Sequence, residues 1–138
     1  MGTSPAIKSI RDLRVYRLAY ELALEIFQLT KRFPKSETYS LVDQMLRSSR
    51  SVASNIREGY AKRRYENIVI RHFSDALGSA EETRTWLDFS RDAGYITNAE
   101  HESLEQRYDE LSAMLYRLVE NWHSIDEQSD LRPLSSDL

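Results

Sequence analysis

The feature of this sequence that most constrains its fold is a run of six large apolar residues spaced alternately four and three positions apart. They are Leu104, Tyr108, Leu111, Leu115, Leu118 and Trp122. Residues at this spacing share one side of an α-helix, because a helix turns once in about 3.6 residues. An unbroken stripe of this kind is typical of a helix packed along its length in a bundle. We therefore expect a long helix here, with other helices as its partners.

Two helices are expected in the first half of the chain. The first begins at Asp12, carries apolar residues three or four positions apart, and ends at Pro34, which no helix interior tolerates well. The second is expected over residues 37–61, with Ser36 as its N-terminal cap. Its apolar positions also recur at helical spacing, so it should bury one face in the same core.

A third helix is expected over residues 65–93, where Gly94 follows as a C-terminal cap and Thr97 or Asn98 caps the fourth helix. The connections between the four segments are short, which places consecutive helices side by side in opposite directions. The sequence therefore predicts an all-α protein, an antiparallel up-down-up-down four-helix bundle.

Length and composition favour one domain. The chain has 138 residues, with few glycines and prolines and no cysteine, which excludes disulfides, thiolate zinc sites and cysteine nucleophiles. We expect residues 1–11 to be a flexible leader, 12–123 the bundle and 124–138 a solvated tail. No long apolar run suggests a membrane span or a secretion signal, so a cytoplasmic protein is expected.

Charge is distributed unevenly along the chain. Residues 1–72 carry a net charge of plus 7 and residues 73–138 a net charge of minus 10, although the whole chain has a formal charge of −3. Such a split indicates either a basic surface for a polyanion or basic and acidic helices that neutralise one another. Composition alone does not decide between the two.

The second expected helix carries a line of basic residues on one outward side. At about 100° per residue, its arginines fall in one sector roughly 120° from the apolar face. The candidate nucleic-acid-binding residues of this basic line are Arg47, Arg50, Arg57, Lys62, Arg63 and Arg64. They suit phosphate groups, while the alternative is a solvated face or ion pairing with the acidic fourth helix of the same or the next subunit. Tyr60 and Tyr65 are the only aromatic residues assigned to this line, which gives base stacking little support.

A second surface combines small and polar residues that suit a close contact. The small polar stripe of the second helix consists of Gln44, Ser48, Ser51, Asn55 and Glu58. On the third helix, Gly78, Glu82, Trp86 and Phe89 lie off the core face, and Gly78 suggests a close helix crossing. We interpret both sets as subunit-interface candidates, although a tilted helix of the same chain is an equal alternative for covering Trp86 and Phe89.

Catalytic chemistry finds little support in the sequence. Glu58 and Glu82 beside amides can do acid–base work, but a structural network explains them better. No nucleophile lies beside a histidine, and Gly59 is isolated rather than part of a phosphate-binding loop. The Glu120-x-x-His123 pair is half of a di-iron motif without its second half. We expect no enzyme, no cofactor and no metal site.

The stretches "FPKSETYSLVDQMLRSSRSVASNIREG" and "ALGSAEE" resemble a bacterial family first noticed as proteins encoded in intervening sequences of 23S ribosomal RNA genes, also labelled S23 ribosomal protein. The resemblance spans roughly residues 13–119. It rests on Phe33-Pro34, Glu37, Tyr39, Gln44, Arg47, Ser51, the Asn55-Ile56-x-Glu58-Gly59 core, and Gly78-Ser79 with Glu82. The sequence departs from the usual pattern at Leu46, where a basic residue is common.

The resemblance implies an antiparallel four-helix bundle that assembles into a ring of five subunits. A relative of the family, the accessory protein of diversity-generating retroelements, is a basic pentamer associated with nucleic acid and reverse transcriptase. We therefore expect a non-enzymatic oligomeric scaffold or accessory protein, with RNA, DNA or a nucleic-acid-processing protein as its partner and no membrane partner. The alternative is a protein–protein assembly module that binds no nucleic acid.

Overall fold

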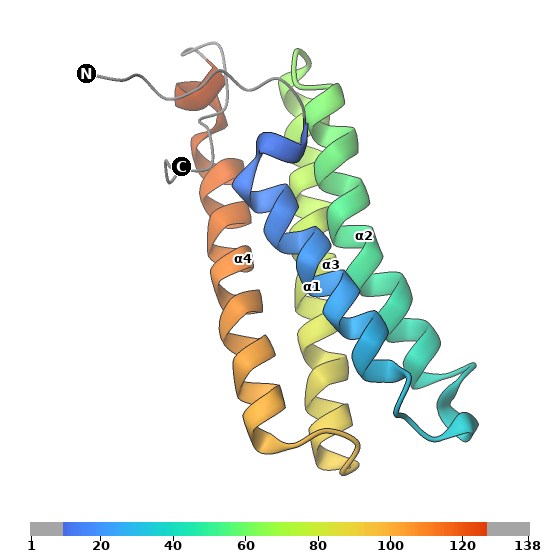
Figure 1. Ribbon diagram of the computed structural model, residues 1–138. Coiled ribbons are helices and arrows are strands. Elements are labelled where there is room, and N and C mark those ends of the chain that lie inside the picture. Colours follow the sequence, from blue (N-terminus) through green and yellow to red (C-terminus); the bar gives the residue numbers. More distant parts are fainter. Residues whose placement is uncertain (1–9, 127–138) are drawn as a thin grey trace.

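The computed structural model describes residues 10–126, in which four helices account for most of the chain. They are α1 (Arg14–Thr30), α2 (Leu41–Ala61), α3 (Glu66–Asp92) and α4 (Asn98–Asp126). Short 3₁₀ helices, η1 (Ile10–Asp12) and η2 (Lys35–Glu37), precede α1 and α2. Figure 1 shows consecutive helices running in opposite directions, and residues 10–126 contain no strand. The predicted all-α four-helix bundle is confirmed.

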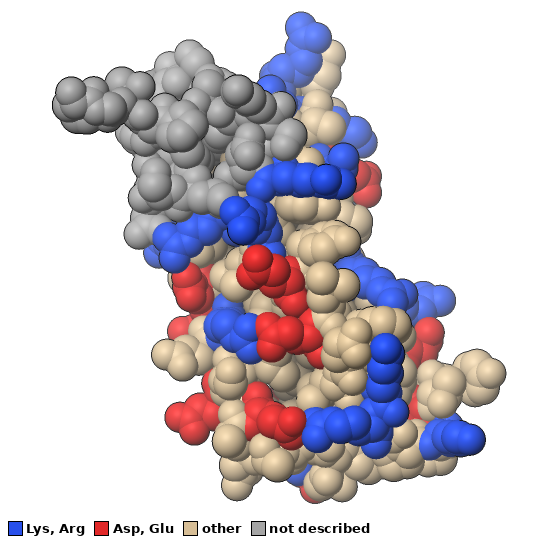
Figure 2. Space-filling model, in the orientation of Figure 1, with Lys and Arg blue, Asp and Glu red and all other residues tan. Residues whose placement is uncertain are grey.

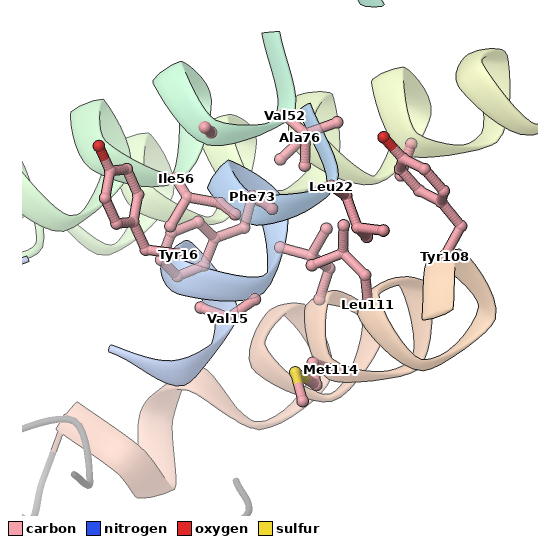
Figure 3. Packing of buried hydrophobic residues seen from close by; sticks show 14 of the residues in the cluster. Val15, Tyr16, Leu22, Val52, Ile56, Phe73, Ala76, Tyr108, Leu111 and Met114 are labelled. Atoms are coloured by element: carbon pink, nitrogen blue, oxygen red, sulfur yellow. The ribbon is translucent and has the colours of Figure 1, made fainter. Parts of the chain in front are cut away.

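The apolar stripe of residues 104–122 lies in the core along its whole length. All six side chains are buried, and Tyr108, Leu111, Leu115 and Leu118 have no exposed surface. They meet apolar faces from the other three helices, as Figure 3 shows for Val15, Ile56 and Phe73. The backbone of α4 leaves helical geometry at Asn121 (φ −118°, ψ 17°), just before Trp122.

The order of packing separates the basic helix from the acidic one. Helix α2 packs mainly on α3 and α1, whereas α4 packs mainly on α3 and less on α1. Helices α2 and α4 are therefore diagonal to each other across the bundle, on opposite sides of the core (Figure 1).

Helix α2 begins later than predicted, because a tertiary contact holds the preceding residues in η2. The carboxylate of Glu37 accepts hydrogen bonds from the Ser40 hydroxyl at 2.6 Å and from the Tyr95 hydroxyl at 2.7 Å. Ser36 lies in η2 and Ser40 takes the N-cap position, without a side-chain capping bond. The prediction that Ser36 caps this helix is wrong, because Tyr95 reaches across from the α3–α4 turn to fix Glu37.

The α3–α4 turn follows the sequence closely. Gly94 has a φ of 79°, which is the left-handed conformation expected of a C-terminal cap. Thr97 and Glu100 form a capping box: the Glu100 N–H donates to Thr97 Oγ1 at 3.0 Å and the Thr97 N–H donates to Glu100 Oε1 at 2.9 Å. Thr97 is thus the cap, one of the two residues predicted.

The two helical glycines have opposite surroundings. A Cβ at Gly59 would lie 2.9 Å from Cε1 of Phe73 and 3.0 Å from Cβ of His72, so α2 and α3 are in close contact there. A Cβ at Gly78 would meet no atom within 4 Å. The close helix contact expected at Gly78 is therefore not found among residues 10–126, and Gly59 makes one instead.

The folded part begins within the segment predicted as a leader, because Ile10 and Leu13 are buried in the core. Helix α4 continues to Asp126, three residues beyond the predicted end of the bundle. The rest of the leader and tail lies outside the described residues, and so does the side chain of His123. No helix among residues 10–126 is long and apolar enough to cross a membrane.

Candidate nucleic-acid interface

The basic line of α2 is largely exposed, as its position in the helix predicts. Arg47, Arg50, Arg57, Lys62 and Arg64 are exposed and Arg63 is half-buried. Arg47 pairs with Asp43 one turn earlier on the same helix, with Nε and Oδ2 3.2 Å apart. Arg50, Arg63 and Arg64 lie over aromatic rings, and Arg57 donates to a tyrosine hydroxyl.

Two of these contacts place the basic line beside α1. The guanidinium carbon of Arg50 lies 5.8 Å from the centre of the Phe27 ring, and Arg57 Nη1 donates to the Tyr16 hydroxyl at 3.4 Å. An arginine over an aromatic ring is held by the ring's negative face and keeps its N–H donors free for another acceptor. Arg50 and Arg57 are therefore oriented along the junction of α1 and α2.

The end of the line lies at the α2–α3 turn. The guanidinium of Arg63 stacks 4.0 Å above the Tyr60 ring and donates to the Tyr60 carbonyl at 2.9 Å. Arg64 lies 5.5 Å from the Tyr65 ring. These local contacts order a cluster of three consecutive cations, with Lys62, at one end of the bundle.

Several acidic residues of α4 are paired with arginines outside the basic line, and Arg107 of α4 itself pairs with an acid of α1. Arg14 of α1 binds Glu110 at 2.9 Å, Arg107 binds Glu25 of α1, and Arg84 of α3 donates to Glu105 at 2.8 Å. The bond to Glu105 raises the pKa of the Arg84 guanidinium. In Figure 2 most acidic side chains of this face lie over its left and centre, interspersed with basic ones, while the upper end and the right edge are mainly basic.

Apart from the Arg47–Asp43 pair, ion pairing between described residues therefore does not neutralise the basic line. Among residues 10–126, no carboxylate lies within salt-bridge distance of Arg50, Arg57 or the three cations of residues 62–64. The alternative that α4 of the same chain balances this line is wrong, because α2 and α4 are diagonal in the bundle.

Sequence reasoning missed the aromatic residues that α1 brings to the line. A groove of about 700 Å³ between α1 and α2 is lined by Arg11, Tyr16, Arg17, Tyr20, Glu21 and Arg57. A second hollow of about 430 Å³ shares three of these residues and adds Phe27 and Arg50. The spacing of Tyr16 and Tyr20 puts both on one face of a helix, which was visible in the sequence. Their position beside α2 was not.

The small polar stripe lies partly inside the chain. Ser48 is buried and accepts a hydrogen bond from Thr83 of α3 at 2.8 Å. Ser51 bonds with Ser79 at 2.9 Å, and Asn55 bonds with His72 at 3.2 Å. The inference that these three groups need a second subunit to be paired is corrected, because α3 of the same chain supplies their partners.

The remaining interface candidates stay at the surface. Gln44, Glu58, Gly78, Glu82 and Phe89 are exposed, and Trp86 is half-buried. The Trp86 and Phe89 rings lie 6.0 Å apart, and the Trp86 indole donates to Glu82 at 3.2 Å. Phe89 is 58% exposed, so no helix of the same chain covers it, contrary to one of the two alternatives. Both rings line a hollow of about 370 Å³ with Gln44 and Leu41 of α2.

One cluster has the side chains of a metal site but the charges of an ion-pair network. Ligand-type atoms of Asp88, His101 and Glu105 lie within 4.8 Å of one another. Asp88 is 2.7 Å from His101 Nε2, Arg91 lies 3.3 Å from His101 Nδ1, and Arg84 donates to Glu105. Two guanidinium groups already supply the positive charge that a metal ion would bring.

The model of the family described as 23S rRNA-intervening sequence protein matches residues 11–117. The chain belongs to this family. A crystal structure from Bacteroides thetaiotaomicron VPI-5482, of a protein with unknown function from the S23 ribosomal protein family, is similar at 28% identity and a TM-score of 0.70. The match covers 76% of this chain and 97% of that one. No curated protein matches.

Membership in the 23S rRNA-intervening sequence family confirms the resemblance noted in the sequence. The matched region runs from η1 through most of α4, so it contains both the basic line and the α1–α2 groove. The description of the family names no enzymatic activity.

Proposed function

We propose that this protein is a non-catalytic accessory protein that binds nucleic acid through the basic line of α2. The observation that carries the proposal is that Arg50, Arg57 and residues 62–64 present cations with no carboxylate of the described residues in salt-bridge distance, while Arg14, Arg84 and Arg107 pair with acids of α4 and α1. Arginine N–H donors fit phosphate oxygens, and each neutralised phosphate releases counterions and adds affinity. The local charge of this face outweighs the negative charge of the whole chain, since charges beyond about 8 Å are screened at physiological salt.

We further propose that the protein works as an oligomer, with the exposed face of α3 at the subunit contact. Phe89 and half-buried Trp86 form an apolar area on α3, and Gly78 lies more than two turns earlier on the same helix, where space is open for another backbone. Large aromatics exposed together are typical of contact surfaces. Light scattering after size-exclusion chromatography tests this proposal: a mass near 16.2 kDa contradicts it, and about five times that mass is the ring suggested by the family resemblance.

The exposed α3 face also favours the second candidate function, a protein–protein assembly module without nucleic-acid binding. Phe89→Ser, together with Gly78→Leu, should lower the mass of the oligomer in either case. Nucleic-acid binding by the wild-type protein separates the two functions, because a pure assembly module should bind no nucleic acid.

The binding proposal is tested by changing Arg57 and Arg64 to glutamine together. This variant should retard unrelated RNA and DNA sequences more weakly than wild type in a gel, because phosphate contacts carry no sequence information. The matched control is Arg32→Gln with Arg107→Gln, which removes two charges that are already paired with Glu100 and Glu25. Equal weakening by both pairs, or no retardation by wild type at low salt, contradicts the proposal.

A further inference from the structure

The α1–α2 groove combines the two kinds of side chain that single-stranded nucleic acid needs. Tyr20 is 50% exposed, and its ring centre lies 6.0 Å from that of Tyr16 at an interplanar angle of 39°. Arg11, Arg17 and Arg57 line the same groove, with Glu21 as its acidic residue. Aromatic faces bind bases by stacking, and arginines bind the phosphates between them.

Two arginines of this groove are available to a ligand. Among the side chains that the structure describes, no carboxylate, including that of Glu21, lies within salt-bridge distance of Arg17 or Arg57. Arg57 is instead held in place by its 3.4 Å hydrogen bond to the Tyr16 hydroxyl, which Figure 3 shows pointing away from the other core side chains. The charges of Arg17 and Arg57 make the groove attractive to anions, with Glu21 as the one acidic residue that lines it.

Another planar group that can stack on a base lies in the hollow that adjoins the groove along α1. Phe27 lies in the adjoining hollow, with the guanidinium of Arg50 at 5.8 Å from its ring centre and the ammonium of Lys31 at 4.6 Å. The ring of Phe27 is thus occupied by cations, while the planar guanidinium of Arg50 can itself stack on a base. Tyr20 and Arg50 therefore line the same hollow, together with Arg57.

We propose that the α1–α2 groove binds an unpaired segment of nucleic acid, with a base stacked on Tyr20 and the neighbouring phosphates on Arg17 and Arg57. The inference rests on the proposed function and adds that the protein prefers unpaired nucleic acid to duplex. A duplex buries its base faces within its own stack, so it can use the arginines but not Tyr20. The basic line then contacts the backbone of any nucleic acid, and the groove distinguishes unpaired from paired segments.

The test uses the full chain and three fluorescently labelled ligands of one length: a single-stranded oligonucleotide, its duplex, and an abasic strand that has phosphates without bases. Wild type should bind the single strand about tenfold more tightly than the abasic strand, as one stacked base provides. Tyr20→Leu should abolish this difference by weakening single-strand binding, and leave duplex and abasic binding unchanged. The control Tyr116→Leu replaces a tyrosine of similar exposure (57%) on α4 and should change nothing.

The outcomes separate this inference from the proposed function. Equal wild-type affinity for single and abasic strands, or a Tyr20→Leu variant that binds the single strand as tightly as wild type, overturns the groove assignment. If changing Arg57 and Arg64 to glutamine still weakened nucleic-acid binding in that case, the proposed function would stand. No binding of any of the three ligands overturns both. Circular dichroism of Tyr20→Leu should match wild type, because the side chain is half-exposed.

Discussion

Gly59 of α2 and Phe73 of α3 touch so closely that the glycine has no room for a side chain: a Cβ at position 59 would lie 2.9 Å from Cε1 of Phe73. Phe73 is fully buried and meets the Trp122 ring edge-on, with ring centres 5.5 Å apart. The phenylalanine has little freedom to move away, because the core around it is densely packed. This contact fixes how α2 and α3 cross.

We expect Gly59→Ala to destabilise the protein. Overpacking of a core costs about 1–3 kcal/mol, and the higher helix propensity of alanine offsets about 1 kcal/mol of it. The net loss should be about 1 kcal/mol, measured as a lower urea midpoint with an unchanged slope. A midpoint at or above that of wild type contradicts the close contact.

Gly78→Ala should have the opposite effect. Position 78 is in the middle of α3, and a Cβ there meets nothing within 4 Å. Replacing an exposed helical glycine by alanine gains about 1 kcal/mol of stability. The midpoint of urea unfolding should rise at protein concentrations low enough for the chain to be monomeric, and a fall there as large as that of Gly59→Ala would show that the environment of Gly78 within the chain is crowded.

Leu111→Ala should leave a cavity in the centre of the core. Leu111 is fully buried, and truncating such a leucine usually costs about 2–5 kcal/mol. Leu24→Ala is the matched control, because Leu24 is 51% exposed and its truncation should change the unfolding free energy little. Equal midpoints for the Leu111 variant and wild type would remove the stripe of α4 from the core.

Acid should destabilise the fold through two carboxylates that are bonded in the native state. Hydrogen bonds from Ser40 and Tyr95 lower the pKa of Glu37, and the Thr97 N–H and Arg32 lower that of Glu100, both from 4.5. Below that value the unfolded chain binds these protons more readily than the folded one, so this stability is present above pH 4.5 and lost as pH falls through the lowered pKa values.

The check is thermal unfolding between pH 7 and pH 3 for wild type and for Glu37→Gln with Glu100→Gln. The double variant should be less stable at neutral pH and should lose less stability on acidification, because glutamine does not titrate. A pH profile parallel to that of wild type would mean that other carboxylates control acid unfolding.

Local patterns in the sequence predicted the parts of the fold that local physics decides. The stripe ending at Trp122, the cap at Thr97 and the turn at Gly94 each depend on residues within a few positions of one another. Ser36 failed as a cap because Tyr95, far along the chain, binds Glu37. Tertiary contacts override a local propensity in such cases.

The candidate site depends on which helices pack against each other, and a single sequence does not show this packing directly. The basic line was identified from its helical spacing, but its aromatic neighbours Tyr16 and Tyr20 belong to another helix. Ser48 was assigned to a subunit contact because its partner, Thr83, is distant in sequence. The sequence alone does not distinguish the surroundings of Gly59 and Gly78, and the packing of α2 on α3 shows that only Gly59 lacks room for a side chain.

The salt dependence of nucleic-acid affinity tests most directly whether the α2 basic line binds phosphate. The logarithm of the association constant of wild type should fall linearly and steeply with the logarithm of salt concentration. Changing Arg57 and Arg64 to glutamine should flatten this slope by about one unit for each lost phosphate contact. A slope that is the same in wild type and in this variant would contradict phosphate binding by the basic line.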